Sequence, residues 1–390
     1  MSPELFVDVY TDQCSKHGEF SCGDAFKSAR LDGGHRIVSV LSDGLGSGLK
    51  ANILANMTVS MAVKFIGSDA EILPSAEMIM DALPVCQERR ISYATFTIVD
   101  CRLDSATRVI EMGNPPFFLL RGEELKDIPY RELVSPRWRD RRLRVYDFDI
   151  QPEDRIIAVS DGITQAGLGR APHKLGWRRS GCLDFACEMV RRNAQVSASE
   201  LARQILSRAL SQTPERLAED DMSCSVHYFR KPRRTLVLTG PPFHEERDRE
   251  TAERVALFPG RTVISGGTTA NIVSRELRRD VHTVLGSGKG LPPISKMNGI
   301  DLVTEGILTL TATARILEDK ELPEERNAAM QLVDVLRNSD VIEFLVGKRI
   351  NEAHQDPSLP VDLEIRRNIV QRIAAALRER HLKQTSIEYI

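Results

Sequence analysis

Short apolar runs, rich in valine, isoleucine, phenylalanine or threonine, punctuate the first 230 positions of this chain. Runs of this length and composition, bounded by polar or glycine-containing segments, predict β-strands. They are FVDVYT, RIVSVLS, YATFTIVD, RVIEMG, FFLLR, RIIAVS and MSCSVHYF. The turn-prone CRLDSAT between YATFTIVD and RVIEMG predicts a hairpin. The alternation of Met222, Cys224, Val226 and Tyr228 predicts a strand with one buried face.

Three longer stretches interrupt these strands with apolar residues at helical spacing, at about 49–66, 69–90 and 181–210. Strands in hairpins with helices grouped between them indicate antiparallel sheets covered by helices. We therefore expect an α+β first half.

The charged, proline-containing RKPRR at 230–234 predicts a domain boundary, with a first domain over 1–230 and a second over 235–390. A solvated loop within one domain is the alternative. Beyond it, TLVLTG and RTVISGG predict strands, and HEERDRETAERVALF and TTANIVSRELRR predict helices. This order is typical of a smaller α/β domain.

Three further segments of the second half predict helices: LVTEGILTLTATARIL, NAAMQLVDVLRNSDVIEFLVG and LEIRRNIVQRIAAALRER. The last places Ile365, Ile369, Ile373 and Leu377 on one face. Such a stripe favours packing in the core over a partner interface. We therefore expect a helix-rich second domain.

Charge and cysteine usage narrow the class of protein. The 53 basic and 55 acidic residues nearly balance, which argues against bulk electrostatic binding to nucleic acid. The seven cysteines form no CxxC pair, which argues against a disulfide framework or a zinc site. The N-terminal residues have no signal-peptide pattern, and no apolar run approaches the ~18 residues of a membrane span. We expect a cytoplasmic protein without a nucleic-acid or membrane partner, and we leave a homodimer open.

Aspartates stand at the predicted strand ends. Asp43 (LSDGLGSG) and Asp161 (AVSDGITQ) follow a strand, Asp220 and Asp221 (AEDDMSCSV) precede one, and Asp24 (SCGDAF) lies in a turn. Strand ends of packed sheets can converge, and clustered carboxylates repel one another unless cations neutralise them. All-oxygen ligands select Mg²⁺ or Mn²⁺. Each motif alone is more typical of an ordinary turn, but together they predict a divalent-metal site.

These motifs resemble, in content and in order, the bacterial branch of the metal-dependent protein serine/threonine phosphatases, which have the phosphatase 2C fold. Within that branch they are similar to the stage II sporulation protein E-like subfamily. The matching segments are SCGDAF, LSDGLGSGLKA, EMGNPPFFLLR, DRIIAVSDGITQAG and EDDMSCSV. The resemblance covers residues 1–230 and leaves the second half unrecognised. It implies two stacked antiparallel sheets flanked by helices, with a dinuclear Mn²⁺ or Mg²⁺ centre at one edge.

The resemblance also implies metal-binding positions in the acidic motifs: Asp24, Asp43, Gly44, Asp161, Asp220 and Asp221. Asp43 would bridge both cations, and the carbonyl of Gly44 would complete one of them. Asp161 would ligate a metal, and Asp220 would supply the last ligand with Asp221 as helper or alternative. Asp24 would act through metal-bound water. The expected catalytic residues are Asp43, Asp161 and Asp220.

Such a centre implies hydrolysis of phosphoserine or phosphothreonine on a signalling protein by a hydroxide that two cations activate. The resemblance makes a phosphorylated anti-sigma-factor antagonist, or a similar small switch protein, one candidate substrate. Domain order leads us to expect a regulatory or partner-binding second domain. One alternative is a non-catalytic scaffold whose second domain binds a nucleotide, a phosphate ligand or a protein. Another is a second half that itself acts on a nucleotide or phosphate.

The segment RTVISGGTTANIVSREL has the order strand, glycine loop, helix, which can hold a phosphate on backbone N–H groups and threonine hydroxyls. The predicted phosphate-binding residues are Gly266, Gly267, Thr268 and Thr269. An ordinary tight turn with a threonine N-cap is the alternative. Asp301 and Glu305, four positions apart on an expected helix, are more typical of a solvated face than of a ligand pair.

Overall fold

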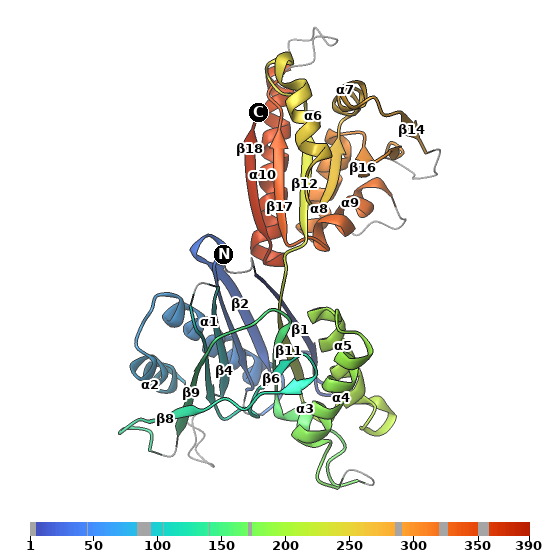
Figure 1. The fold of residues 1–390 in the computed structure, drawn as a ribbon. Helices are drawn as coiled ribbons and strands as arrows, with labels where there is room; N and C mark the ends of the chain where they lie inside the picture. The colour runs from blue at the N-terminus through green and yellow to red at the C-terminus, as the bar shows by residue number, and fades with distance from the viewer. Residues whose placement is uncertain are drawn as a thin grey trace. The chain divides into compact units, whose positions relative to one another are not determined.

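In the computed structural model the chain forms two compact units, Met1–Lys231 and Pro232–Ile390 (Figure 1). The structure describes residues 5–44, 46–83, 95–103, 105–139, 141–170, 174–284, 291–319, 327–349 and 359–390, the side chains of 359–363 excepted.

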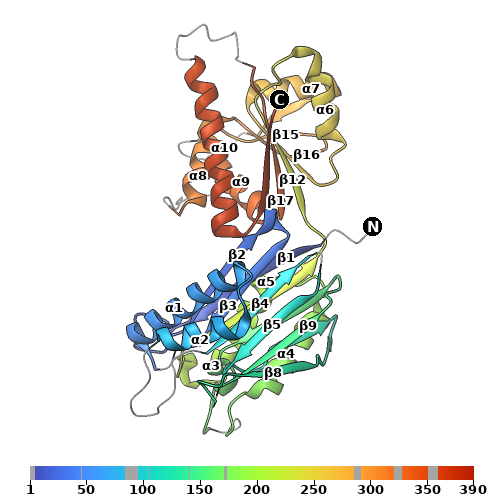
Figure 2. The same ribbon diagram turned by 90° about the vertical axis from the view of Figure 1, so that its left-hand side faces the viewer.

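Two antiparallel sheets stack face to face in the first unit (Figure 2). The five-stranded sheet has the order β1 (Phe6–Cys14), β11 (Met222–Arg230), β10 (Asp154–Val159), β6 (Phe118–Arg121), β7 (Glu124–Leu125). The six-stranded sheet has the order β2 (Ala25–Leu31), β3 (Arg36–Ser42), β4 (Phe96–Arg102), β5 (Thr107–Met112), β9 (Arg142–Phe148), β8 (Tyr130–Val134). The apolar side chains between the sheets form one core cluster.

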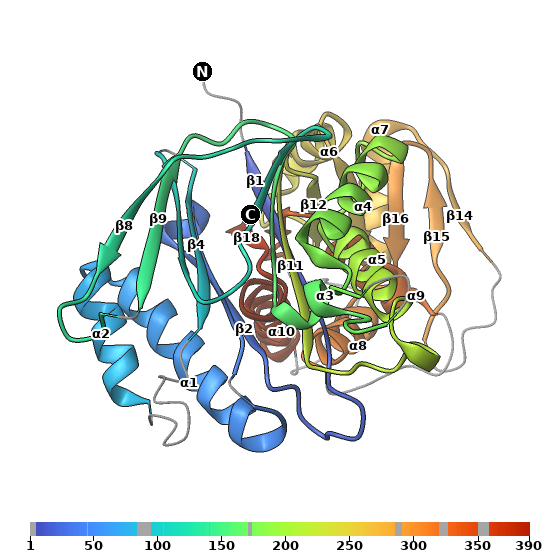
Figure 3. The same cartoon turned by 90° about the horizontal axis from the view of Figure 1, so that it is seen from below.

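Helices cover the outer face of each sheet in this unit (Figure 3). On the six-stranded sheet lie α1 (Gly48–Gly67) and α2 (Ile72–Ala82). On the five-stranded sheet lie α3 (Asp161–Gln165), α4 (Arg178–Arg192) and α5 (Ala198–Leu210). Short 3₁₀ turns lie at η1 (Asp32–Gly34) and η2 (Pro214–Arg216). The predicted sandwich of antiparallel sheets flanked by helices is confirmed.

The predicted strands and the β4–β5 hairpin are confirmed, but some boundaries were wrong. The expected helix over 181–210 is two helices, because α4 ends at Arg192 and Ser197 caps α5 by accepting a hydrogen bond from the N–H of Glu200 at 3.2 Å. The expected helix over 69–90 is α2 as far as Ala82, and its part over 84–90 lies outside the described residues. Strand β11 is buried on both faces, not on one, because helices cover one face and the second sheet covers the other.

The second unit is built on a seven-stranded mixed sheet, described by itself. Its order is β14 (Val281–Thr283), β15 (Ser295–Met297), β16 (Ile300–Thr304), β13 (Arg261–Ser265), β12 (Arg234–Thr239), β17 (Val341–Val346), β18 (Gln384–Tyr389). The strands from β16 to β18 run parallel, and β14 and β15 pair antiparallel at one edge. The parallel strands follow the expected alternation with helices, so the α/β prediction is confirmed.

Helices pack on both faces of this sheet (Figures 1 and 2). One face carries α6 (Asp248–Ala256), which follows η3 (Glu245–Arg247), and α7 (Gly267–Leu277). The other carries α8 (Ile307–Leu317), α9 (Ala328–Arg337) and α10 (Leu359–His381). On α10, Ile369, Ile373 and Leu377 are buried in that core, as the apolar stripe predicted, while Ile365 is 37% exposed.

Two expected helices of the second half are each a strand and a helix. The first part of 302–317 belongs to β16, and Gly306, with φ 144°, starts the turn into α8. The segment 327–347 contains α9 and then β17, which lies centrally between β12 and β18. Apolar runs of five or six residues fit a buried strand or a helix equally well by periodicity, and pairing in the sheet decides between them. Asp301 and Glu305 consequently lie on β16 and in the following loop, not on one helix.

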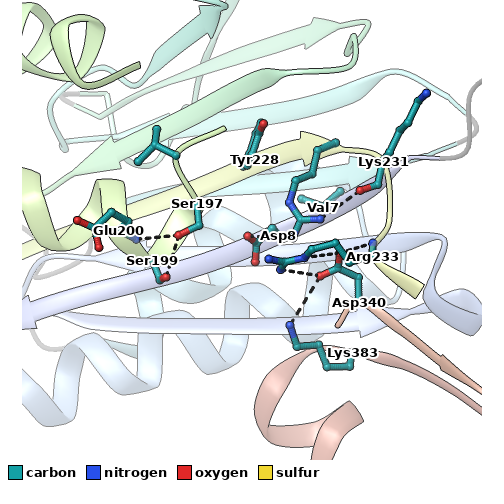
Figure 4. Close-up of polar contacts among 12 residues, drawn as sticks. Val7, Asp8, Ser197, Ser199, Glu200, Tyr228, Lys231, Arg233, Asp340 and Lys383 are labelled. Carbon is teal, nitrogen blue, oxygen red and sulfur yellow. Dashed lines mark hydrogen bonds and ion pairs between the residues drawn. The ribbon is translucent and has the colours of Figure 1, made fainter. Parts of the chain in front are cut away.

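A buried carboxylate fixes the start of the second unit (Figure 4). The Oδ2 of Asp340 accepts a hydrogen bond of 2.7 Å from the backbone N–H of Arg233, and its Oδ1 accepts one of 3.1 Å from the guanidinium. The Nζ of Lys383 lies 3.8 Å from the same Oδ1. Because Asp340 is fully buried, these two cations compensate a charge that burial alone would make costly.

Among the helices that the structure describes, none combines the length and the apolar character that crossing a membrane would require.

Candidate functional site

The strand ends place the acidic motifs on neighbouring strands. Asp43 follows β3 and Asp24 precedes β2, and these strands pair so that Ala25 faces Ser42. Asp161 follows β10 and Asp221 precedes β11, and these strands also pair. The sheets are joined here, because the Oγ of Ser223 on β11 donates a hydrogen bond of 2.7 Å to the Oδ2 of Asp24.

Each Ser-Asp-Gly motif uses its serine to fix the strand end. The Oγ of Ser42 donates to the carbonyl of Thr95 at 2.7 Å. The backbone N–H of Asp43 donates to the Thr95 hydroxyl at 3.1 Å. The Oγ of Ser160 accepts from the N–H of Ser223 at 2.9 Å. These contacts tie the segments that carry the aspartates to neighbouring segments of the chain.

The remaining carboxylates also have local donors. The Oδ2 of Asp161 accepts from the Nε2 of Gln165 at 2.8 Å, one helical turn away. The Oδ1 of Asp221 accepts from the N–H of Lys16 at 3.0 Å, and the Oδ1 of Asp220 accepts from the N–H of Asp221 at 2.9 Å. These bonds leave other carboxylate oxygens available to a ligand.

The electrostatics of Asp43 show that the carboxylates lie near one another. Burial raises the pKa of Asp43 to about 9, and the charges of Asp24, Asp161 and Asp220 contribute to this shift. A hydrogen bond between the side chains of Asp43 and Asp161 raises it further. Two unit charges 4 Å apart interact by about 4 kcal/mol at an effective dielectric constant near 20, so this arrangement strongly favours a compensating proton or cation.

Asp24 and Asp220 belong to the same electrostatic group. Burial raises the pKa of Asp24 to about 7, hydrogen bonds from Ser223 and Ser160 oppose the shift, and the charges of Asp221 and Asp161 add to it. Burial also raises the pKa of Asp220, again with a contribution from Asp161. The five aspartates singled out from the sequence therefore act on one another.

Glycines allow the backbone to close around this cluster. A Cβ on Gly44 would lie 2.6 Å from the carbonyl oxygens of both Gly23 and Ala51. A Cβ on Gly162 would lie 2.1 Å from the carbonyl oxygen of Asp221. The two Asp-Gly motifs thus need glycine because another backbone segment occupies the space of a side chain.

The carboxylate oxygens of this cluster are chemically suited to bind a hard divalent cation. The Oδ2 of Asp221 is buried and accepts no hydrogen bond of normal geometry from the described residues, and the thiol of Cys22, a weak donor, is the group beside it. Oxygen ligands of this kind suit Mg²⁺ or Mn²⁺. Within the part of the chain that the structure describes, however, no group of three or more His, Cys, Asp and Glu side chains is arranged to hold a metal ion.

Sequence reasoning did not single out the residues that orient the aspartates. Ser42 and Ser160 had a signal, because both precede an Asp-Gly pair after an apolar strand. Gln165 lies one helical turn after Asp161, a local spacing that is present in the sequence, whereas the contacts of Thr95 and of the Lys16 N–H arise only when distant segments meet in the fold.

A family model described as stage II sporulation protein E (SpoIIE) matches residues 33–229, which is half of the chain. The chain belongs to the stage II sporulation protein E family. The match contains three of the four acidic motifs, while Asp24 lies before its first residue. It ends at the last residues of β11, so membership in the SpoIIE family concerns the first unit.

Curated relatives share this region at low identity. Stage II sporulation protein E of Bacillus subtilis (strain 168) is 23% identical over 175 residues, which are 44% of this chain and 21% of that protein. Stage II sporulation protein E of Priestia megaterium is 22% identical over 221 residues, which are 56% of this chain and 36% of that protein. The chain thus spans between a fifth and about a third of the length of these relatives.

A solved structure of the PP2C phosphatase domain and a fragment of the regulatory domain of SpoIIE from Bacillus subtilis aligns with a TM-score of 0.46 and 19% identity. The alignment covers 58% of this chain and 62% of that one. At this score it adds no argument beyond the family match.

In the predicted phosphate-binding loop of the second unit, two backbone N–H groups already donate hydrogen bonds to carbonyl groups of the protein. The N–H of Gly266 donates to the carbonyl of Thr304 at 2.9 Å, and the N–H of Gly267 donates to the carbonyl of Glu305 at 3.0 Å. Thr269 is buried, and α7 begins at Gly267. A phosphate at Gly266, Gly267, Thr268 and Thr269 stays a prediction.

Proposed function

We propose that the first unit hydrolyses phosphoserine and phosphothreonine esters on a protein, using two divalent cations, Mn²⁺ or Mg²⁺. The observation that carries this proposal is the mutual electrostatic effect of Asp24, Asp43, Asp161 and Asp220 at one edge of the sandwich. Membership in the SpoIIE family supports it. The buried Oδ2 of Asp221, which among the described residues has only the weakly donating thiol of Cys22 beside it, adds an acceptor that a cation would satisfy.

The residues proposed to hold the cations are Asp43, Asp161, Asp220 and the carbonyl of Gly44, with Asp221 and Asp24 beside them. The cations, when bound, supply Lewis-acid polarisation of the phosphoryl group and of the attacking water. Asp43 would be the central ligand, since the charges of Asp24, Asp161 and Asp220 all act on it.

The chain's other residues are proposed to position these ligands. The Ser223 and Ser160 hydroxyls favour the charged form of Asp24 and so keep it available as an acceptor. Gln165 holds one oxygen of Asp161, which fixes the rotamer of the carboxylate. Burial raises the pKa of the Cys22 thiol, and the charge of Asp24 raises it further, so this cysteine stays protonated and is a poor nucleophile.

The substrate class and the regulation are also proposals. The resemblance favours a phosphorylated switch protein of the anti-sigma-factor-antagonist type. The second unit, which has its own sheet and cores, is proposed to regulate the first unit or to bind a partner. Comparing the hydrolysis rate of the full chain with that of residues 1–231 tests this regulation, and equal rates for the same phosphopeptide would speak against it.

The activity is tested on metal-free protein with p-nitrophenyl phosphate and a phosphothreonine peptide, with and without Mn²⁺. We expect hydrolysis that depends on Mn²⁺ and that falls by at least about 100-fold in Asp161→Asn, because a ligand is lost. Asp184→Asn on the exposed side of α4 is the matched control and should keep its activity. Mn²⁺ binding without any turnover would favour a scaffold, and an undiminished rate in Asp161→Asn would refute the assigned site.

A further inference from the structure

A groove of about 440 Å³ lies between α4 and α5, on the outer side of the five-stranded sheet. From α4 it receives Phe185, Met189 and Arg192, which share one helix face at spacings of four and three residues. Its volume falls within the range of pockets that hold drug-sized ligands. None of its lining residues belongs to the acidic cluster.

Three arginines line the groove: Arg192, Arg208 and Arg216. Among the described residues no aspartate or glutamate lines it. Arg192 forms an ion pair with Glu188 outside the lining, whereas the guanidinium of Arg208 lies 5.8 Å from the ring centroid of Phe185. Because like charges repel, an anion between the guanidinium groups would stabilise this arrangement. Arginine forks bind phosphate through paired N–H groups.

A strained turn places one of these arginines. Glu215 and Arg216 have φ of 52° and 58°, two successive non-glycine residues in the left-handed region. Arg216 donates from its guanidinium to the Oγ of Ser207 at 3.1 Å, across one end of the groove. Strain of this kind often accompanies a binding function, because the fold must hold a side chain where relaxed backbone would not.

A buried acceptor in the wall supplies an independent sign of a ligand. The Nε2 of Gln204 donates to Glu200, which fixes the orientation of the amide. The Oε1 of Gln204 is then buried without a hydrogen-bond partner among the described residues. This oxygen lies beneath the surface of the groove, and a small shift of a neighbouring side chain would expose it to a ligand hydroxyl or amine. The groove therefore offers guanidinium groups and an apolar surface, with one acceptor directly beneath them.

We propose that this groove binds a small organic phosphate of the nucleoside monophosphate class. The phosphate lies among Arg192, Arg208 and Arg216, and the flat apolar part packs on Phe185 and Met189. Once a neighbouring side chain has shifted, the Oε1 of Gln204 accepts from a hydroxyl or amino group of the ligand. This site is separate from the acidic cluster and does not depend on its cations.

The test is titration calorimetry of the full chain in EDTA, so that neither turnover nor a metal–phosphate contact contributes. The probes are AMP, ribose 5-phosphate and inorganic phosphate. We expect AMP to bind at least about 10-fold more tightly than inorganic phosphate, since stacking on Phe185 adds to the charge contacts. Equal affinity for all three probes, or no heat with AMP at millimolar concentration, would overturn the proposal.

Variants locate the binding. Arg208→Ala and Arg216→Ala should each weaken AMP binding about 10-fold, because each removes a charge-assisted contact. Arg203→Ala is the matched control. Arg203 lies on α5, as Arg208 does, but its guanidinium stacks on Tyr10 at 5.0 Å from the ring centroid, outside the groove. Thermal unfolding checks that all three variants fold. An equal loss in Arg203→Ala would show that AMP binds elsewhere and would refute the site.

Discussion

The Oγ of Ser223 donates a hydrogen bond of 2.7 Å to the Oδ2 of Asp24, 199 positions away in the chain. Ser223 lies on β11 in the five-stranded sheet, and Asp24 directly precedes β2 in the six-stranded sheet. This single bond therefore ties the two sheets together at the edge where the aspartates meet. It also favours the charged form of Asp24, which burial opposes.

Replacing Ser223 by alanine should weaken Mn²⁺ binding at the proposed site without unfolding the protein. Since the hydroxyl lowers the pKa of Asp24, its removal raises that pKa, and a higher pH is needed to ionise the carboxyl. We expect a roughly 10-fold higher Mn²⁺ concentration for half-maximal hydrolysis and an acid limb of the pH–rate profile shifted upward. Ser225→Ala is the control, because the Ser225 Oγ donates a long hydrogen bond of 3.5 Å to the Ala158 carbonyl and none to an aspartate among the described residues. An unchanged profile in Ser223→Ala would contradict this role.

Gly162 should not tolerate alanine. The added Cβ would lie 2.1 Å from the carbonyl oxygen of Asp221, so α3 and the start of β11 must separate. We expect a loss of about 2 kcal/mol or more in the free energy of unfolding, together with loss of hydrolysis. Gly67→Ala is the control, because its Cβ would meet only the tip of Leu31 at 3.1 Å, and we expect a change within about 0.5 kcal/mol. Urea unfolding measures the free energy of unfolding of both variants. Equal losses would refute the claim that Gly162 in particular has no room for a Cβ.

His227 should make the first unit sensitive to acid. It is fully buried, and burial lowers its pKa to about 4, with a backbone contact to Ile156 opposing only part of the shift. Between pH 6.5 and 4 the unfolded state binds a proton that the folded state does not, so stability falls as the pH falls through this window. The loss amounts to at most about 3 kcal/mol. Urea unfolding at pH 7 and pH 5, in EDTA, should show a smaller loss for His227→Leu, and an equal loss would show that other groups cause it.

The sequence predicted the sandwich well because its strands carry strong local signals. The runs at β3, β10 and β11 are rich in valine, isoleucine and other apolar residues, and each strand is buried on both faces in the structure. Strand β9 was missed, because charged residues such as Arg142 and Asp147 interrupt its apolar positions. In the second half, β16 and β17 were read as helix, because short apolar runs next to a true helix extend its apparent periodicity.

The carboxylates of the site could be predicted from the sequence, but most residues that hold them in place could not. Asp43 and Asp161 share a local pattern, strand followed by Asp-Gly, which can be seen in the sequence. The contact of Thr95 with Asp43 exists only because β3 and β4 pair, and no local pattern encodes it. The groove at Arg208 and Arg216 was also missed, since exposed arginines on a helix and in a turn look like a solvated surface.

We propose that the aspartates of four separate motifs hold a pair of divalent cations. Crystals of the full chain grown with Mn²⁺ and measured at the manganese absorption edge would reveal these cations. We predict two anomalous peaks in contact with the Asp43 carboxylate, both absent from crystals of Asp43→Asn. Peaks that lie only elsewhere, or no peak beside Asp43, Asp161 and Asp220, would contradict the account.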